Sequence, residues 1–372
     1  MRANAKNNVR NGNHCRVALV GAGAIGSALG LMVARGGRVD SAVIIDPDVF
    51  ENRNYQGQNV LPGEIARGKA SVLARKMRQI NPRMKIRAIR AAVEAVPLGL
   101  LRRAHAFLGC LDNRGARRFL NRAAQHLQAG CYIDAAVEPS TKLVRVNVYR
   151  PGKNRPCLQC AWSDADYALL DAVYPCRRNE NGRGANNVPS ALGNLAASLQ
   201  LIELEKVLSN RWEEALVGKQ VTLCLLPHTL HVTRFERNPS CRCRHEAWAV
   251  STLKLRDDCT FEDLLKRTNG QSMSVEGGSF VRTLACKGCA RRRPVLRLES
   301  RLGRRLQICR HCGQTMIPLG FDQIQMLSRE MLAKREIRAP LRDRGIVSRD
   351  IVAIHAGDDL QRYELLLGRA SD

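Results

Sequence analysis

The chain has 372 residues, of which 45% are hydrophobic, so it is long enough for one large domain or two modest ones, each with its own core. Lys and Arg number 60 against 34 Asp and Glu, which gives a formal net charge of +26. This excess predicts an acidic partner: an acidic protein, a nucleic acid or a polyanionic ligand. Aromatic residues make up only 4%, which argues against binding of single strands by base stacking.

The N-terminal residues 1–14 are polar and contain no apolar segment of the kind that a signal peptide needs. We therefore expect a flexible or swapped arm and a cytoplasmic protein. The uncharged stretch at 17–34 is marginally long enough to span a membrane. Its four glycines, and the apolar strand pattern that follows at 41–45, favour a strand, a turn and a helix instead, so we expect no membrane span.

A nucleotide-binding turn is predicted by the pattern GxGxxG at Gly21, Gly23 and Gly26. The first glycine permits a sharp turn, the second lets the backbone approach a phosphate, and the third lets the helix pack on the strand. The N-terminus of the helix then attracts an anion. Asp46 ends the next strand twenty residues after Gly26, where its carboxylate can accept the ribose hydroxyls. Together these features predict a nucleotide-binding strand–helix–strand unit.

The alternation of strands and helices continues to about residue 150, which predicts a parallel sheet with right-handed crossovers and helices on both faces. The alternating apolar and polar residues at 141–150 predict an antiparallel strand, and we expect zinc-stapled antiparallel strands to extend the sheet. In chain order the expected elements are a helix at 65–80, strands at 84–89 and 104–111, a helix at 114–129, strands at 131–136 and 141–150, a loop-rich segment at 161–187, a helix at 190–208 and strands at 220–237.

Fourteen cysteines in a chain expected to be cytoplasmic suggest metal sites more than disulfides. Eight of them form four close pairs, and four thiolates suit one tetrahedral Zn²⁺, so the count predicts two zinc sites. The pairs are Cys157 with Cys160, Cys241 with Cys243, Cys286 with Cys289, and Cys309 with Cys312. In the first site His245 competes with Cys243 for the fourth position, and we favour Cys243 because thiolates dominate structural sites.

The last two pairs, CKGC and CRHC, are separated by nineteen residues, which is the spacing of a zinc ribbon. We place this ribbon at about 280–320, within a C-terminal extension at 250–372 that follows the arm at 1–14 and the main domain at 15–249. Within the extension we expect an amphipathic helix at 322–334 and a small α/β element at 338–368.

Several motifs in fixed order resemble the ThiF/MoeB family, the adenylating enzymes related to ubiquitin-activating enzymes. The resemblance covers roughly residues 12–248. It is carried by GAGAIGS at 21–27, IIDPD at 44–48, NYQGQ at 54–58, GKA at 68–70, INP at 80–82, CLDNRGARRFLN at 110–121, CLQC at 157–160, the cysteine at 176, ALGNLAASLQLIELEKVL at 191–208 and RNPSC at 237–241.

The resemblance implies a Rossmann-like fold that binds ATP and Mg²⁺. It places the loop of Gly21, Gly23, Ala24, Ile25 and Gly26 at the ATP phosphates. Asp46 then binds the ribose within the segment that includes Asp48, Lys69 contacts the phosphates, and Asp112 holds Mg²⁺ next to Asn113. Asn54 and Gln58 match polar residues of the family's SNLxRQ segment.

Two positions leave the chemistry open. The SNLxRQ arginine falls on Gly57, so either Arg53 or an arginine of the arm (Arg2 or Arg10) replaces it, or adenylation is weakened or lost. Cys176 occupies the position of the family's reactive cysteine. Its neighbours Arg177 and Arg178 would favour the thiolate, although an incidental loop cysteine is the alternative.

We therefore expect adenylation of the C-terminal carboxylate of an acidic, ubiquitin-like or sulfur-carrier-like β-grasp protein. Thioester or persulfide transfer through Cys176 to a downstream conjugating or sulfur-transfer protein would follow. The family implies a homodimer. The alternative is a scaffold that recognises an acidic protein, or less favoured a nucleic acid, through its basic ribbon. An NAD-dependent oxidoreductase fits poorly, because Lys69, Asp112 and the cysteine pairs have no role in it.

Overall fold

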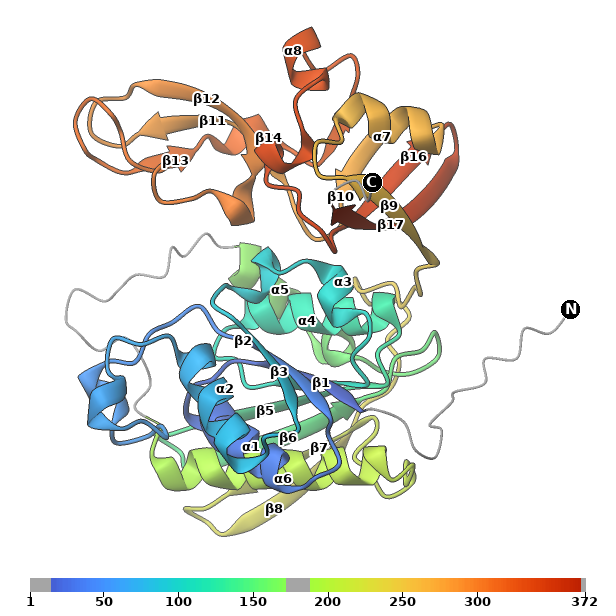
Figure 1. The fold of residues 1–372 in the computed structure, drawn as a ribbon. Coiled ribbons are helices and arrows are strands. Elements are labelled where there is room, and N and C mark those ends of the chain that lie inside the picture. Colours follow the sequence, from blue (N-terminus) through green and yellow to red (C-terminus); the bar gives the residue numbers. More distant parts are fainter. Residues whose placement is uncertain (1–14, 172–187, 369–372) are drawn as a thin grey trace, which may run out of the picture. The chain divides into compact units, whose positions relative to one another are not determined.

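The computed structural model describes residues 15–171 and 188–368 (Figure 1). The chain divides into two compact units. The first consists of residues 1–93 and 101–247, and the second of residues 94–100 and 248–372. The short segment 94–100 therefore belongs with the C-terminal half, which its sequence does not indicate.

The first unit is built on one eight-stranded sheet with the strand order β3-β2-β1-β4-β5-β6-β7-β8. The first five strands in this order run parallel, and β6, β7 and β8 continue antiparallel. This confirms the predicted Rossmann-like sheet with its antiparallel extension. The strands are β1 (Arg16–Val20), β2 (Ser41–Ile45), β3 (Lys85–Ile89), β4 (Ala106–Gly109), β5 (Cys131–Glu138), β6 (Leu143–Tyr149), β7 (Lys219–Cys224) and β8 (Thr229–Arg234).

Helices cover both faces of this sheet, as predicted. On one face α1, α2 and α6 pack together, and α4 lies on the other (Figure 1). At Gly30 of α1 an added Cβ would lie 3.0 Å from side-chain atoms of Leu73 and Met77, so a small residue lets α2 approach closely. The helices of this unit are α1 (Ala24–Arg35), α2 (Lys69–Ile80), α4 (Arg114–Leu127), α5 (Asp164–Asp171) and α6 (Ser190–Leu208), whereas the short α3 (Leu98–Leu101) lies almost wholly in the segment 94–100 of the second unit.

The central strands β1 and β4 are buried on both faces, which explains why they read as nearly continuous apolar runs in the sequence. Leu19 and Leu108 lie in the core, each no more than 1% exposed. Burial of such a side chain stabilises the fold by about 1.5–3 kcal/mol. The carboxyl ends of these strands are therefore held rigidly, and the loops that follow them start from fixed positions.

The second unit contains a five-stranded sheet with the order β15-β10-β16-β17-β9, in which only β17 and β9 run parallel. Helix α7 (Phe261–Thr268) begins at Thr260, whose side chain accepts a hydrogen bond from the Asp263 amide, and buries Phe261 and Leu264 in the core of this unit. The strands are β9 (Val250–Arg256), β10 (Ser272–Val275), β15 (Met326–Ser328), β16 (Ile351–Ala356) and β17 (Asp359–Gly368).

The ribbon is a separate small sheet within the second unit. Strand β11 (Phe280–Cys286) pairs with β12 (Arg292–Leu298) and β13 (Met316–Pro318), and also with the two-residue strand β14 (Gln323–Ile324). Its own small core contains Val281, Leu284 and Met316 together with cysteine side chains. The cysteine pairs thus lie at hairpin turns, as the spacing predicts.

The prediction of an amphipathic helix at 322–334 is wrong. This segment forms β14 and β15, and the only helix near its end is the four-residue α8 (Lys334–Ile337). Met326–Ser328 pairs with β10, and Leu327 is fully buried, so tertiary pairing overrides a helical pattern of apolar residues. The tail at 338–368 is mainly the β16–β17 hairpin, preceded by a single 3₁₀ turn at Leu341–Arg344.

The segment 94–100 is tied to the second unit through its backbone. The Gly99 amide donates to the Arg349 carbonyl over 2.9 Å, and Arg301 Nε donates to the Ala95 carbonyl over 3.1 Å. The same arginine forms a bidentate ion pair with Asp350, which fixes its guanidinium. As to membranes, none of the helices within 15–171 and 188–368 is long and apolar enough to cross one.

Candidate functional site

The glycine turn after β1 has the geometry that its sequence predicts. Gly21 has φ +94°, and a Cβ there would lie 2.2 Å from the Cys110 carbonyl oxygen. A Cβ at Gly26 would lie 1.9 Å from the Gly21 carbonyl oxygen. Both positions therefore require glycine. Gly23 precedes α1, and within the described chain no side chain caps this helix and no atom lies within 4 Å of an added Cβ at Gly23. The first amides of α1 are thus open to an anion.

Asp46, the predicted ribose-binding acid, also holds the glycine turn in place. Its Oδ2 accepts the Ala22 amide over 2.6 Å, and its Oδ1 accepts the Asp48 amide over 2.8 Å. Asp46 is 5% exposed, and this burial raises the pKa of its carboxyl, against the opposing effect of the two amides and Lys69. Each carboxylate oxygen keeps a further lone pair. Asp46 can therefore fasten the turn and still accept a hydroxyl.

Lys69 lies at the start of α2, where its amide donates to the Asp48 carbonyl over 2.9 Å. Its ammonium Nζ lies 3.4 Å from Asp48 Oδ2. The lysine side chain is 9% exposed, whereas that of Asp48 is 64% exposed. The Asp48 carboxylate is therefore largely solvated and only weakly neutralises the Lys69 ammonium. A phosphate approaching α1 would offer the ammonium a second anion.

The segment from Asn54 to Asn59 lies beside the start of α1, because the Asn59 amide donates to Ser27 Oγ over 3.2 Å. Asn54 is buried, and its Oδ1 accepts the Glu51 amide over 2.8 Å, so it shapes this loop. The Gln58 Oε1 atom is buried and accepts no hydrogen bond from any residue that the structure describes. It is a buried acceptor that the described part of the chain leaves without a donor.

Gly57, the position of the family's arginine, is closed to any side chain. A Cβ there would lie 2.1 Å from the Val188 carbonyl oxygen. Arg53, one of the predicted substitutes, pairs with Glu51 through Nε and Oε2 at 2.7 Å. The other two, Arg2 and Arg10, lie outside the described residues. The Val188 carbonyl therefore occupies the space that an arginine side chain would need, and only glycine fits at position 57.

Asp112 follows β4, the strand next to β1, and its side chain is exposed. The adjacent Asn113 caps α4 by accepting the Ala116 amide over 2.8 Å, and its Nδ2 lies 3.3 Å from Asp112 Oδ1. Since the Cys110 carbonyl packs against Gly21, the loop that carries Asp112 begins directly beside the glycine turn. Predicted phosphate and metal ligands thus lie on neighbouring strand ends.

A buried network below this loop was missed from the sequence. Arg117 of α4 pairs with Asp134 of β5 and also donates to the Leu111 carbonyl, directly before Asp112. Tyr132 donates its hydroxyl to Asp134 over 2.8 Å. The available signal was an arginine four residues after the helix cap. Its pairing with a strand residue seventeen positions later could not be deduced from spacing.

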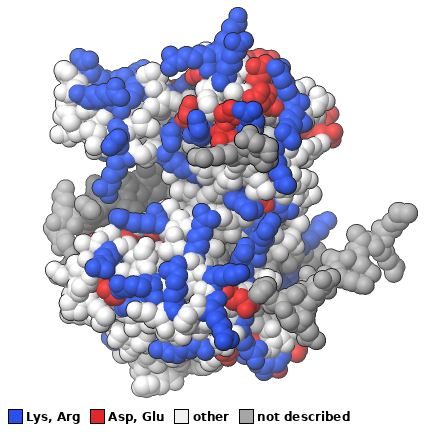
Figure 2. All heavy atoms as spheres, in the orientation of Figure 1, with Lys and Arg blue, Asp and Glu red and all other residues white. Residues whose placement is uncertain are grey.

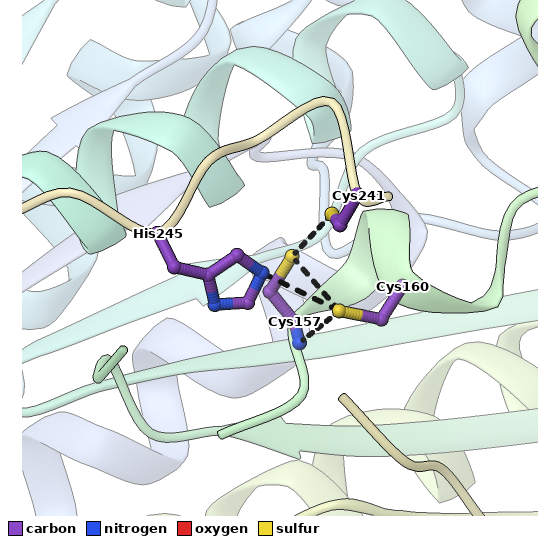
Figure 3. A group of neighbouring side chains, drawn as sticks. All are labelled: Cys157, Cys160, Cys241 and His245. Atoms are coloured by element: carbon purple, nitrogen blue, oxygen red, sulfur yellow. Dashed lines mark hydrogen bonds between the residues drawn. The ribbon is translucent and has the colours of Figure 1, made fainter. Parts of the chain in front are cut away.

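Three of the predicted cysteine ligands in the first unit converge with His245 (Figure 3). The donor atoms of Cys157, Cys160, Cys241 and His245 all lie within 4.8 Å of one another. Cys157 Sγ lies 3.8 Å from Cys241 Sγ, and Cys160 Sγ lies 3.3 Å from His245 Nε2. His245 Nδ1 lies 3.3 Å from the Gly152 carbonyl, which suits a ring that presents Nε2 to a metal.

This arrangement differs from the preference for Cys243. The Cys243 thiol is buried, receives the Asn121 side-chain amide at 3.7 Å and contacts Cys157, but the four donor atoms that all lie within 4.8 Å of one another include His245 instead. A Cys₃His set is an ordinary zinc ligand set. The sequence offered both donors, and the CxC spacing could not rank them.

The second cluster contains all four predicted ribbon cysteines, Cys286, Cys289, Cys309 and Cys312, whose sulfurs lie within 4.8 Å of one another. Backbone amides donate to these sulfurs, as expected for thiolates. The amides of Cys312 and His311 lower the pKa of Cys309 to about 6. Four soft donors at this spacing fit one Zn²⁺.

Comparison with known proteins identifies the first unit. A model of the ThiF family matches residues 4–243, more than half of the chain. The chain belongs to the ThiF family. The match agrees with the order of the sequence motifs and with the positions of the glycine turn after β1 and the Asp112 loop after β4. No curated protein matches the sequence.

Solved structures of similar fold include several of MccB. For Escherichia coli MccB with succinimide the identity is 20% and the TM-score 0.51, over 62% of this ThiF-family chain and 66% of that one. For the microcin C7 biosynthetic enzyme MccB with N-formylated MccA, identity is 19% and the TM-score 0.51, over 62% and 67%. The chain thus spans about two thirds of MccB or slightly less, and at this identity the likeness shows the fold.

Of the predicted site residues, Gly21, Gly23, Ala24, Gly26, Asp46, Asp48 and Lys69 gather at the carboxyl ends of β1 and β2, and Asp112 with Asn113 follows the adjacent β4. The Ile25 side chain is buried in the core, so only its backbone faces the turn. The candidate reactive cysteine, Cys176, lies outside the described residues.

Proposed function

We propose that this ThiF-family chain is an ATP-dependent adenylyltransferase that activates a C-terminal carboxylate. One observation carries the proposal: an uncapped helix N-terminus, a buried lysine and an exposed aspartate stand at the ends of adjacent parallel strands. Ligands of open parallel sheets bind at this edge, where the strand order switches direction. A carboxylate that attacks the α-phosphate there forms an acyl adenylate and releases pyrophosphate.

The residues have distinct tasks in this proposal. The amides at the start of α1 and the Lys69 ammonium bind the phosphates, while Asp46 keeps the glycine turn in place and accepts a ribose hydroxyl. Asp112 would hold Mg²⁺, which offsets the negative charge of the phosphates when bound. The Gln58 carboxamide, whose oxygen has no partner within the described segments, accepts a hydrogen bond from the nucleotide or the substrate.

A peptide or protein terminus is the substrate class that the comparisons support. MccB has been determined with ATP and with the peptide MccA, and it shares the fold of the first unit. We extend this to an acidic β-grasp carrier, because the chain carries a net charge of +26. Transfer through Cys176 to a downstream protein and assembly as a homodimer belong to the same proposal. Light scattering at micromolar concentration would measure the mass of the assembly.

A second candidate is a scaffold that binds ATP without using it. Gly57 favours this reading, because the close Val188 carbonyl excludes the family's arginine and removes a cation from the phosphates. The two functions differ in one measurable property, the carrier-dependent exchange of pyrophosphate into ATP.

The test combines calorimetric titration with ATP and MgCl₂ and an assay of radiolabelled pyrophosphate exchange. The second assay includes a panel of small β-grasp proteins that end in Gly-Gly and the MccA peptide. We expect ATP binding, and exchange that depends on one of these carboxylates. ATP binding with no exchange across the panel would support the scaffold, and absence of ATP binding would rule out both functions.

A further inference from the structure

The ribbon carries a concentration of positive charge that the adenylation site does not use. Residues 281–320 contain ten Lys and Arg but only one acidic residue, Glu299. Four of the arginines hold the fold together. Arg282 donates to the Met331 carbonyl, Arg293 to the Leu306 and Ile308 carbonyls, Arg297 to the Arg301 and Asp343 carbonyls, and Arg301 to Asp350. These four arginines therefore have a structural role, and their presence needs no external partner.

The other six cations are exposed, and no partner is found for their side chains among the described residues. Four of them lie within three residues of a ribbon cysteine in the sequence, and the other two lie in the turn between Leu302 and Leu306, which pack against the cysteine side chains; we call this group the ribbon tip. Figure 2 shows Lys and Arg, and little Asp or Glu, over the part of this face that the ribbon forms. The ribbon tip consists of Lys287, Arg291, Arg292, Arg304, Arg305 and Arg310.

Strand pairing places part of the ribbon tip on one outward face. Arg292 and Ile317 both pair with Ala285 of β11, so the three side chains form one row across the sheet. The inward neighbour Met316 is 2% exposed, whereas Ile317 is 40% exposed. Just beyond β11, the Lys287 amide donates to the Thr315 carbonyl, so the backbone pairing continues as far as Lys287. Arg292, Ala285 and the half-exposed Ile317 thus lie on the outward face of the ribbon sheet.

This composition favours nucleic acid over an acidic protein. The stretch 281–320 contains no Phe, Tyr or Trp, and Phe280 at the start of β11 is fully buried, so the ribbon tip has no exposed aromatic of the kind that anchors protein interfaces or stacks on single strands. Ion pairs between exposed side chains of two proteins contribute little. A duplex backbone, by contrast, presents a dense row of phosphates and releases condensed counterions when cations neutralise it. Five of the six cations are arginines, whose planar fork binds phosphate oxygens in pairs.

We propose that the ribbon tip binds the phosphate backbone of double-stranded nucleic acid without reading its sequence. This is independent of adenylation, since none of the six residues belongs to the ATP site. If all six cations contact phosphates, the plot of log affinity against log salt has a slope of about −5. Raising KCl from 50 to 200 mM then weakens binding about a thousandfold.

The test uses the full-length, zinc-loaded chain and a fluorescein-labelled 20-base-pair DNA of random sequence, followed by fluorescence anisotropy at several KCl concentrations. Arg304→Ala/Arg305→Ala removes two charges from a turn that contains no cysteine. We expect about tenfold weaker binding at 100 mM KCl and a salt slope reduced by about 2. Arg335→Ala/Arg338→Ala, which removes two exposed charges outside the ribbon, should change the affinity less than twofold.

A second pair, Arg292→Ala/Arg310→Ala, should reproduce the loss, and zinc content with thermal unfolding verifies that each variant folds. Equal effects of the ribbon and control pairs would overturn the proposal, as would no binding by the parent at 50 mM KCl. Displacement of the duplex by poly-glutamate at equal charge concentration would show a docking site for acidic protein instead. Tighter binding of the corresponding single strand would also contradict it.

Discussion

Arg117 Nη1 lies 2.6 Å from Asp134 Oδ2, and this ion pair is buried below the loop that carries Asp112. The arginine side chain is 9% exposed, and the aspartate is fully buried. Because the same guanidinium donates to the Leu111 carbonyl, the pair fixes the backbone directly before Asp112. The position of Asp112 therefore depends on a buried charge pair outside the candidate site.

Arg117→Met should destabilise the chain by about 3–5 kcal/mol, because it removes the close partner of a buried carboxylate and leaves Asp134 with the Tyr132 hydroxyl at 2.8 Å and the more distant Arg145 guanidinium at 4.0 Å. Urea unfolding measures this loss. Arg118→Met, one position further along the same helix and only half-buried, is the matched control and should cost less than about 1 kcal/mol. Replacing both partners, as Arg117→Met/Asp134→Leu, should recover part of the loss. Equal stabilities of the two single variants would contradict the role of the pair.

Gly57→Arg should not restore the family's cation. The Cβ of any side chain at this position meets the Val188 carbonyl oxygen, so the loop must move for alanine as well as for arginine. We expect Gly57→Ala and Gly57→Arg to lower ATP affinity alike, as measured by calorimetry. The opposite result would be an arginine variant that binds ATP more tightly than the parent while the alanine variant binds it more weakly. That result would show that this position still accepts the cation.

The zinc content should be two equivalents per chain, since two separate groups of four donors come together. His245→Ala should lose one equivalent, because His245 belongs to the first group, whereas Cys243→Ala should keep both. Atomic emission analysis of protein purified without added zinc gives the count. Loss of zinc from Cys243→Ala with retention by His245→Ala would reverse the ligand assignment.

Lys69→Met should weaken ATP binding ten- to a hundredfold, which corresponds to the 1.5–3 kcal/mol of a hydrogen bond to a charged group. The buried methylene stem is kept, and only the ammonium is lost. Lys85→Met, an exposed position at the start of β3, provides the control with the same chemical change. Indistinguishable dissociation constants for these two variants would remove Lys69 from the phosphate site.

The sequence predicted the parts of the fold that depend on local chemistry. The glycine turn follows from the positive φ of Gly21 and the close backbone approach at Gly26, and the strands from continuous apolar runs. Residues that pair across long separations were not predictable. Arg117 with Asp134 is one case, and the incorporation of Met326–Ser328 into a sheet is another, because both depend on tertiary contacts.

The candidate site shows the same division. Motif spacing drew attention to Asp46 and the four ribbon cysteines, but it could not predict that the His245 ring lies among Cys157, Cys160 and Cys241, because that depends on the three-dimensional path of the chain. The Gly57 departure could be read as a lost cation from the sequence. Only the structure shows the Val188 carbonyl that occupies the space.

Carrier-dependent pyrophosphate exchange, measured side by side for the parent, Asp112→Ala and Cys176→Ala, tests the adenylation proposal most directly. In the proposed reaction Asp112 acts where charge changes at the α-phosphate, so its loss should reduce exchange at least a hundredfold, while Glu213→Ala, an exposed acid elsewhere in the first unit, should not. In the same proposal Cys176 acts only after the adenylate has formed, so its variant should exchange like the parent. Parent-like exchange by Asp112→Ala would contradict the account.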